Sequence, residues 1–377
     1  MYLTNEQTLI TDMANAFARD EMRPNAQAWE QSKTLDRATL SALAELGFAG
    51  VYTQAEHGGS DLSRLDAVLI FEQLSKGCIS HATFLSIHNM ATWMIDRFGD
   101  QNLRAKYIPA LVSGERIASY CLTEPGAGSD AASLRTRAEQ VGEHYVLNGS
   151  KVFISGAGFS DLYVVMARTA DSGARGISTF VVEKGTDGLS FGKNEDKMGW
   201  RAQPTATVSF DDCRIPLENR VGQDGDGFKY AMAGLDGGRI NIAACSLGGA
   251  QDALDRAAAY AKDRKQFGKS IADFQATQFK LADMETDLQA ARALLYQAAA
   301  KLDDKTADAS TFCAMAKRFV TDVGFRVANE ALQIHGGYGY LADYDVERIV
   351  RDLRVHQILE GTNEIMHVIV SRAVLGR

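Results

Sequence analysis

The sequence predicts a mainly α-helical protein with a β domain in the middle of the chain. Apolar residues recur at helical spacing before about residue 115 and after about residue 222, and short β-branched and aromatic runs lie between these regions. The 377 residues suffice for two or three domains with ample core. We therefore expect an N-terminal helical domain over residues 1–115, a middle β domain over 116–222 and a C-terminal helical bundle over 223–377.

The N-terminal third carries clear signals for helix ends. Thr4-Asn5-Glu6-Gln7 matches a capping box, which predicts a first helix directly after it. Asp36 begins a second helix with leucines at helical spacing, and Gly47 ends it. Further apolar-periodic segments predict helices at about 63–76, 80–98 and 101–113.

The middle of the chain is predicted to form a β-sheet. Glycine, aspartate and asparagine separate five runs with strand composition: Ile117–Thr123, Tyr145–Asn148, Leu162–Arg168, Ile177–Glu183 and Thr205–Phe210. Asn148-Gly149 is a strong signal for a hairpin turn. We interpret this region as an antiparallel sheet that forms a small barrel or sandwich.

The last part of the chain returns to helix after the glycine-rich join Gly222–Gly227. Long periodic segments follow at about 226–264, 273–302 and 307–335, with little glycine or proline inside the last two. Helices of that length pack naturally as an antiparallel bundle.

Composition and charge exclude several classes of protein. The net charge of −8 and the absence of a Lys/Arg-rich run argue against a nucleic-acid surface. No apolar stretch approaches the roughly 18 residues of a membrane span. The N-terminus lacks a basic region followed by an apolar run, so we expect no signal peptide. A cytoplasmic location in a bacterium follows, or the mitochondrial matrix if a transit peptide has been removed.

Cysteine and histidine usage argues against disulfides and metals. The five cysteines are far apart and none forms a C-x-x-C pair, so they read as buried thiols in a reducing compartment. The seven histidines show no ligand spacing such as H-E-x-x-H. We therefore expect no metal site.

Two short stretches in the β region match known functional motifs, but their surroundings do not fit those functions. Gly126–Ala131 fits the dinucleotide fingerprint G-x-G-x-x-A, but the residues after it have no apolar stripe for a helix packed on a sheet. A glycine-rich turn can still offer backbone N–H groups to a phosphate or flavin. Gly188–Gly192 fits the hydrolase motif G-x-S-x-G, but no helix follows it, so we interpret it as a strand.

Glu360 is the residue with the clearest catalytic potential. It follows two aliphatic residues and precedes Gly361, and Thr362 can cap a last helix with Glu364 near its positive end. A carboxyl group held against apolar neighbours has a raised pKa, which suits a general base near neutral pH. The alternative from these residues alone is a solvated glutamate before a helix.

Two further turns are ambiguous by themselves. Arg264–Gly268 and His335–Tyr340 each end a long helix. Their basic and glycine residues can complement a helix C-terminus, or they can meet a diphosphate.

Taken together, these features resemble the acyl-CoA dehydrogenase family of flavoenzymes. Six stretches carry the resemblance in the family's order and spacing: Tyr120–Asp130, Asn148–Ser155, Leu235–Arg239, Arg264–Phe267, Gln333–Gly337 and Glu360–Thr362. The resemblance implies an N-terminal helical domain, a middle β-barrel and a C-terminal four-helix bundle. It also implies FAD as cofactor, a homotetramer, and electron transfer to electron-transferring flavoprotein.

The resemblance also implies a reaction. Glu360 would remove the α-proton of an acyl-CoA thioester while the β-hydrogen leaves as hydride to flavin N5. The Glu360 backbone N–H and a ribityl hydroxyl of FAD would stabilise the enolate. Ser155–Gly158, Leu189–Lys193 and His356–Glu364 most resemble family members that act on isobutyryl-CoA in valine breakdown. Other short acyl groups, 2-methylbutyryl or butyryl, remain alternatives.

Three sets of site residues follow from matching positions. The flavin-contacting set is Tyr120, Cys121, Leu122, Thr123, Ser129, Phe153, Ile154 and Ser155. The set on the diphosphate and adenine side, partly across a subunit boundary, is Arg264, Phe267, Phe274, Gln275, Gln333, Gly336, Gly337, Thr362, Asn363 and Glu364. The substrate set is Ser129, Asp236, Arg239 and Gly361.

Three of these positions carry open questions. Phe153 stands where the family often has tryptophan, and Phe274 stands where some relatives have a polar residue. Arg239 has a structural alternative as a buried cation. A different class of function is a non-catalytic helical binding protein on the same fold, although the presence of Glu360 beside Gly361-Thr362 argues against it.

Overall fold

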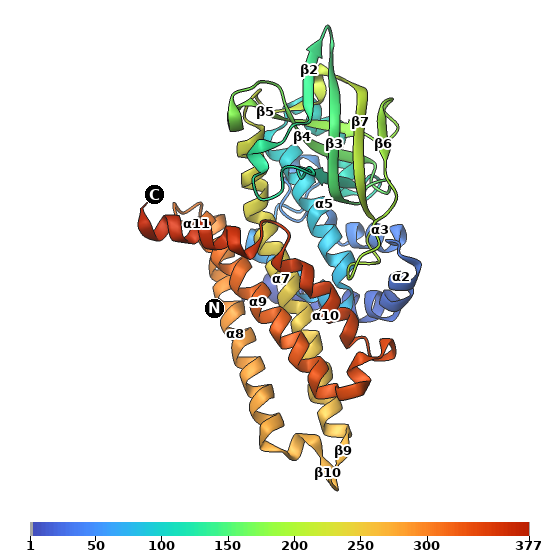
Figure 1. The fold of residues 1–377 in the computed structure, drawn as a ribbon, viewed down its shortest axis with the longest axis vertical. Coiled ribbons are helices and arrows are strands. Elements are labelled where there is room, and N and C mark those ends of the chain that lie inside the picture. The colour runs from blue at the N-terminus through green and yellow to red at the C-terminus, as the bar shows by residue number, and fades with distance from the viewer. Residues whose placement is uncertain (1–2, 377) are drawn as a thin grey trace.

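The computed structural model describes residues 3–376. Figure 1 shows the sheet at one end of the molecule and the long C-terminal helices extending to the other, with the N-terminal helices beside them. The six N-terminal helices are α1 Asn5–Phe17, α2 Ala26–Ser32, α3 Arg37–Glu45, α4 Arg64–Gly77, α5 Ile79–Phe98 and α6 Gln101–Val112. The helical character predicted for this third is confirmed.

Local capping chemistry explains where the first helices begin. The Thr4 side chain accepts from the Gln7 backbone N–H while the Gln7 side chain accepts from the Thr4 backbone N–H, as a capping box requires. The Asp36 carboxylate accepts from the Thr39 N–H at the start of α3. Gly47 follows α3 with φ of 81°, a left-handed conformation that suits glycine.

The middle of the chain forms one eight-stranded sheet. Its strands are β1 Ala118–Cys121, β2 Arg137–Val141, β3 His144–Ser155, β4 Leu162–Arg168, β5 Ile177–Glu183, β6 Leu189–Phe191, β7 Thr205–Pro216 and β8 Arg220–Val221. The order is β6-β7-β3-β2-β4-β5-β8, with β1 paired to β4. The motif at Gly188–Gly192 therefore contains strand β6, as predicted.

The expectation of a closed, antiparallel barrel was wrong. Over the described residues the sheet stays open, because its edge strands β6 and β8 are three and two residues long and do not pair with each other. The sheet is also mixed, since β4 runs parallel to both β1 and β2. Alternate β4 residues still pack into two different cores. Val164 joins a core that the sheet shares with the helices, and Val165 joins a core built from residues of the β domain.

The predicted hairpin turn at Asn148-Gly149 was also wrong. Both residues lie inside β3, and the tight turn is at Gly142-Glu143, between β2 and β3. The Asn148 side chain instead exchanges hydrogen bonds with Asp212 on β7, where the register between the strands shifts. Gly149 packs so closely on Thr136 that a Cβ there would lie 2.6 Å from Thr136 Oγ1.

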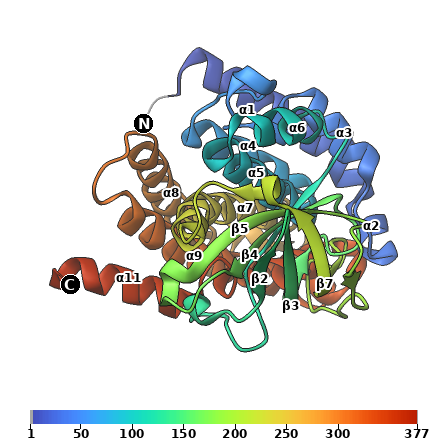
Figure 2. The same cartoon turned by 90° about the horizontal axis from the view of Figure 1, so that it is seen from above.

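The C-terminal part is built from long helices. These elements are α7 Gly227–Asp263, α8 Gln275–Asp303, α9 Ala309–His335, α10 Val346–Arg354 and α11 Asn363–Leu375, with the hairpin β9 Lys265–Gln266 and β10 Lys269–Ser270 after α7. The view from above, nearly down the axis of α7, shows this helix beside β5 and close to α5 (Figure 2). Thus α7 connects the sheet to the far end of the bundle.

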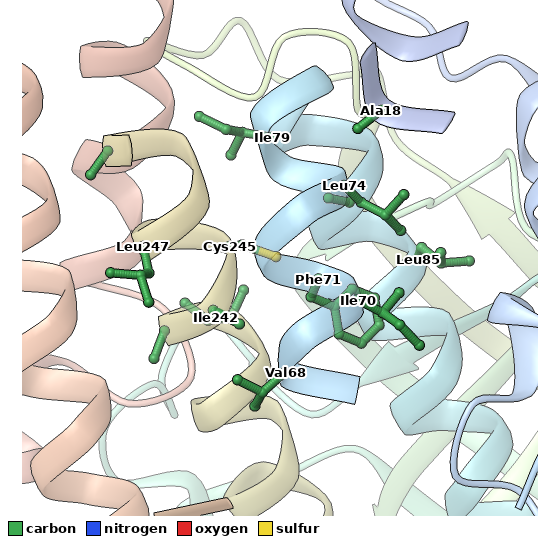
Figure 3. Close-up of a cluster of buried hydrophobic side chains, with 14 of the residues drawn as sticks. Ala18, Val68, Ile70, Phe71, Leu74, Ile79, Leu85, Ile242, Cys245 and Leu247 are labelled. Carbon is green, nitrogen blue, oxygen red and sulfur yellow. The ribbon is translucent and has the colours of Figure 1, made fainter. Parts of the chain in front are cut away.

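The main core joins the N-terminal helices to α7. Val68, Phe71 and Leu74 of α4 lie toward Ile242 and Cys245 of α7 (Figure 3). The backbones approach closely, since a Cβ at Gly248 of α7 would lie 1.9 Å from the Glu72 carbonyl oxygen of α4. Glycine at this helical position therefore allows the close packing.

All five cysteines are free and buried, as the sequence predicted. Within the part of the chain that the structure describes, no helix has both the length and the apolar character needed to cross a membrane.

Candidate active site

Glu360 lies in a short loop between α10 and α11, with its side chain partly buried. Its backbone is left-handed, with φ of 56°, and Gly361 follows at 88°. Burial raises the pKa of the Glu360 carboxyl to about 7, although the positive charges of Arg239 and Lys317 act in the opposite direction. The rise expected from the sequence is present, and its main cause is the loss of hydration.

The space around the Glu360 carboxylate is tightly defined by α7. A Cβ at Gly238 would lie 2.5 Å from Glu360 Oε2, so a larger residue at this position would displace the carboxylate. Glu360 Oε2 is buried and has no hydrogen-bond partner among residues 3–376. A buried oxygen without a partner is costly in a finished core and is expected where a ligand completes the site.

Tyr120 provides a second such atom. Its hydroxyl is buried and also lacks a protein partner in the described chain. Burial, followed by the nearby Glu360 charge, raises the pKa of Tyr120 well above its ordinary value. Tyr120 therefore keeps its proton near neutral pH and can donate a hydrogen bond.

The backbone of the Glu360 loop is held by two cations from different helices. Arg239 of α7 donates from Nε to the Glu360 carbonyl oxygen at 3.3 Å. Lys317 of α9 donates from Nζ to the Gly361 carbonyl oxygen at 2.8 Å. Arg239 also pairs with Asp236 at 2.7 Å and is only 6% exposed. Asp236 and Arg239, two members of the predicted substrate set, thus have protein partners beside Glu360.

Most of the predicted flavin-contacting set lies along two adjoining segments, the end of β1 with the residues after it and the end of β3. Phe153 is 70% exposed and left-handed, because the irregular pairing between β3 and β7 turns its ring outward. Ser155 accepts a hydrogen bond from Gln203. Thr123 is half-buried and its carbonyl oxygen accepts from the Val152 N–H at 2.9 Å. The two segments are therefore tied together.

Three other members of this set have side chains that are buried in the protein. The Cys121, Leu122 and Ile154 side chains lie in the hydrophobic cores, so only their backbones can contact a cofactor. Ser129 is exposed in the loop after Gly128. This loop passes into a single 3-10 turn instead of a helix packed on a parallel sheet, which excludes a dinucleotide-binding βαβ unit here.

A buried ion pair fixes the loop after β1. Lys151 of β3 is fully buried and donates to Glu124 at 2.7 Å and to the Leu122 carbonyl oxygen at 3.2 Å. Glu124 also accepts from the backbone N–H groups of Arg135 and Thr136. The segment that carries Tyr120–Thr123 is thus anchored to β3 by a satisfied polar network.

The remaining diphosphate and adenine set lies at the opposite end of α7, beside the β9–β10 hairpin (Figure 1). A cavity of about 390 Å³ there is lined by Arg264, Gly336 and Gly337, among others. Phe267, 94% exposed at the hairpin tip, meets Phe274 edge-on. Gln275 begins α8, and Gln333 lies in the last turn of α9. Within a single chain, these residues therefore lie far from Glu360.

The start of α11 lies next to Glu360. Thr362 caps this helix by accepting from the Ile365 N–H, as predicted. Glu364 is exposed in its first turn. The Asn363 side chain is buried and bonded to Lys317, Thr321 and Asp322, so its polar atoms are already used within the protein.

Two residues beside Glu360 were missed in the sequence. Gly238 is one of two consecutive glycines inside a long helix, which signals a close approach. Lys317 follows Cys313 by four residues and precedes Val320 by three, so a charge stands on the apolar face of its helix. Both signals are local, but the neighbour of each residue is far away in the chain.

The chain is similar to known proteins over most of its length. Family models match three successive parts of the chain: acyl-CoA dehydrogenase N-terminal domain at residues 4–115, middle domain at 119–213 and C-terminal domain at 225–375. The chain belongs to the acyl-CoA dehydrogenase family. It is therefore an oxidoreductase with acyl-CoA dehydrogenase activity.

Individual relatives of this acyl-CoA dehydrogenase cover almost its whole length. Mitochondrial isobutyryl-CoA dehydrogenase from Bos taurus is 53% identical over 375 residues, which is 100% of this chain and 90% of the relative. A structure described as the electron transferring flavoprotein of Acidaminococcus fermentans matches with a TM-score of 0.97 and 43% identity, covering 100% of both chains. Butyryl-CoA dehydrogenase from Megasphaera elsdenii matches with a TM-score of 0.96 and 39% identity, covering 100% of this chain and 99% of that one.

Proposed function

We propose that this enzyme oxidises a short branched-chain acyl-CoA, isobutyryl-CoA, to its α,β-unsaturated product, with Glu360 as the base. The observation that carries the assignment is the Glu360 carboxyl itself, which combines a pKa of about 7 with a buried oxygen that lacks a protein partner. Such a group is ionised in part near neutral pH and is free to accept a proton.

The residues around Glu360 fit FAD, the cofactor of this family of flavoproteins. The exposed Phe153 ring offers an aromatic face, and the unpartnered Tyr120 hydroxyl offers a hydrogen bond. The first backbone N–H groups of α11 suit the negative charge of a diphosphate. We propose that Tyr120–Thr123, Phe153–Ser155 and the start of α11 hold it. When bound, FAD supplies the hydride acceptor.

The protein groups then have separate tasks. The Glu360 carboxylate takes the proton from the α-carbon of the thioester, and in this proposal the Glu360 backbone N–H stabilises the developing charge on the thioester carbonyl oxygen. Arg239 and Lys317 hold the carbonyl groups on the other side of the loop. The glycine at 238 preserves the space in which the carboxylate reaches its substrate.

The choice of isobutyryl-CoA rests on the 53% identity to the Bos taurus enzyme. The rivals are butyryl-CoA and 2-methylbutyryl-CoA, since one methylene changes binding by about 1–3 kcal/mol.

A panel of acyl-CoA thioesters tests the assignment. The FAD-loaded protein is expected to be yellow, to be bleached anaerobically by isobutyryl-CoA, and to give its highest kcat/KM with that substrate. A higher kcat/KM for butyryl-CoA would transfer the assignment to that rival. A colourless protein that takes up no FAD would contradict the whole proposal and favour a non-catalytic binding protein on this fold.

We further propose a homotetramer in which a second subunit completes each cofactor site, with electron-transferring flavoprotein as the electron acceptor. The separation of the two groups of cofactor residues along α7 supports shared sites. The proposed domains are 1–115, 116–222 and 223–377. Light scattering checks the assembly, and turnover with the purified acceptor flavoprotein checks the electron route.

A further inference from the structure

Lys317 is a buried cation without a carboxylate partner. Its side chain is 0% exposed, and within residues 3–376 no acidic group lies within ion-pair distance of it. Its Nζ instead donates to the Gly361 carbonyl oxygen at 2.8 Å and to Asn363 Oδ1 at 2.9 Å. Burying an ammonium group is costly, so its hydrogen bonds to the loop after Glu360 call for an explanation beyond packing.

The loop that Lys317 contacts is strained. Glu360 is a non-glycine residue in the left-handed region, a conformation that costs about 1 kcal/mol or more and persists only when its surroundings enforce it. The contacts of Arg239 and Lys317 with two successive carbonyl groups supply that restraint from α7 and α9. Because the backbone of Glu360–Gly361 is held on both sides, the direction in which the Glu360 side chain leaves the backbone is fixed.

The charge of Lys317 also acts on Glu360. Burial lowers the pKa of the Lys317 ammonium to about 8, while Glu360 acts to keep it charged. Conversely, Lys317 and Arg239 favour the ionised form of Glu360 against its burial. The other charged or titratable groups facing this pair come from α7, β1, the loop after α3, α9, the turn after α10 and α11: Asp236, Tyr120, Tyr52, Asp322, His356 and Glu364.

We propose that Lys317 is a positioning residue of the reaction, which holds the Glu360–Gly361 loop in its left-handed conformation and favours the charged form of the base. It does not touch the substrate in this role. The inference deepens the proposed function and rests on Glu360 being the base.

The test compares Lys317→Met and Lys317→Arg in the FAD-loaded full-length protein. In Lys317→Met the nearby charge is lost. The pKa that governs the fall of kcat/KM at low pH, the acid limb of the pH profile, should therefore rise by about one unit. With a starting pKa of about 7, that shift alone lowers the ionised fraction of Glu360 at pH 7 about fivefold. Lys317→Arg keeps the charge and should leave the acid limb in place.

A second readout isolates proton removal from electron transfer. Loss of deuterium from the α-carbon of labelled isobutyryl-CoA into water should slow in Lys317→Met by a factor similar to that in kcat/KM. The matched control is Lys280→Met, which removes a half-exposed lysine paired with Glu330 on the surface of α8 and should leave both readouts unchanged.

Two results would overturn the role proposed for Lys317. An unmoved acid limb in a folded Lys317→Met protein overturns the inference, as does a Lys317→Arg protein whose acid limb rises by half a unit or more. If Lys317→Met does not fold, Lys317→Gln supplies the uncharged variant, and its acid limb must rise by about one unit. Full activity in Glu360→Gln would instead overturn the proposed function, so the two failures are distinguishable.

Discussion

Replacing Glu360 by glutamine keeps the size of the side chain and removes its ability to accept a proton. General-base catalysis contributes about 10²–10⁴ in rate, so the rate of flavin reduction by isobutyryl-CoA should fall about 10²–10⁴-fold. FAD and acyl-CoA binding should persist, because no cofactor-contacting group changes. Anaerobic stopped-flow bleaching of the flavin measures the first effect, and the flavin-to-protein absorbance ratio measures the second.

The same substitution has a predicted effect on stability. The pKa of Glu360 is about 7 in the folded protein against 4.5 ordinarily, a rise of 2.5 units. At about 1.36 kcal/mol per unit, ionising this buried group weakens the folded state by at most about 3 kcal/mol, and residual exposure reduces that figure. This cost is nearly absent below pH 4.5, grows as the pH rises, and is complete above about 7.

Glu360→Gln should therefore raise Tm by a few °C at pH 8 and by much less at pH 5. Differential scanning calorimetry at the two pH values checks this, with wild-type protein at the same FAD occupancy as control. An unchanged or lowered Tm at pH 8 would refute the assignment of burial as the cause of the raised pKa. Undiminished flavin bleaching would refute Glu360 as the base.

Further tests address the surroundings of the base. Gly238→Ala should lower kcat at least about tenfold with FAD retained, because the new Cβ would lie 2.5 Å from Glu360 Oε2. Gly234→Ala, whose Cβ would meet the flexible Met94 and Met90 side chains at 3.1 Å or more, should be much milder in the same assay. Lys151→Met leaves the buried Glu124 unpaired and should cost about 3–5 kcal/mol, seen as a lower Tm and weaker FAD retention on dialysis; an unchanged Tm would contradict the anchoring role. In the wild-type enzyme kcat/KM should rise with pH through about 7 and then level, since the base must lose its proton; a fall over that range would exclude Glu360 as that base.

Local signals predicted the helices well. Thr4 and Asp36 identify helix starts because the atoms that cap a helix lie within three residues of its first turn. The pKa of Glu360 was also foreseen in direction, since its aliphatic neighbours are adjacent in the chain.

Long-range pairing explains the errors. Whether the sheet closes depends on the two edge strands, β6 and β8, which are distant in sequence and too short to signal their partners. Asn148 resembled a turn residue until its hydrogen bonds placed it against Asp212, 64 residues away. Lys317 carried a visible anomaly, a charge on an apolar stripe, but its contact with Gly361 arises only from the packing of α9 against the loop.

The length of α7 has a consequence for how this enzyme acquires its cofactor. Gly238 and Arg264 are separated by 26 residues of nearly continuous helix, or about 39 Å along its axis. A rod of that length cannot fold back to bring its two ends to one ligand. If partner subunits supply the missing end, FAD binding and assembly obey a single mass-action equilibrium. Dilution would then release cofactor and subunits together, and added FAD would hold the oligomer intact.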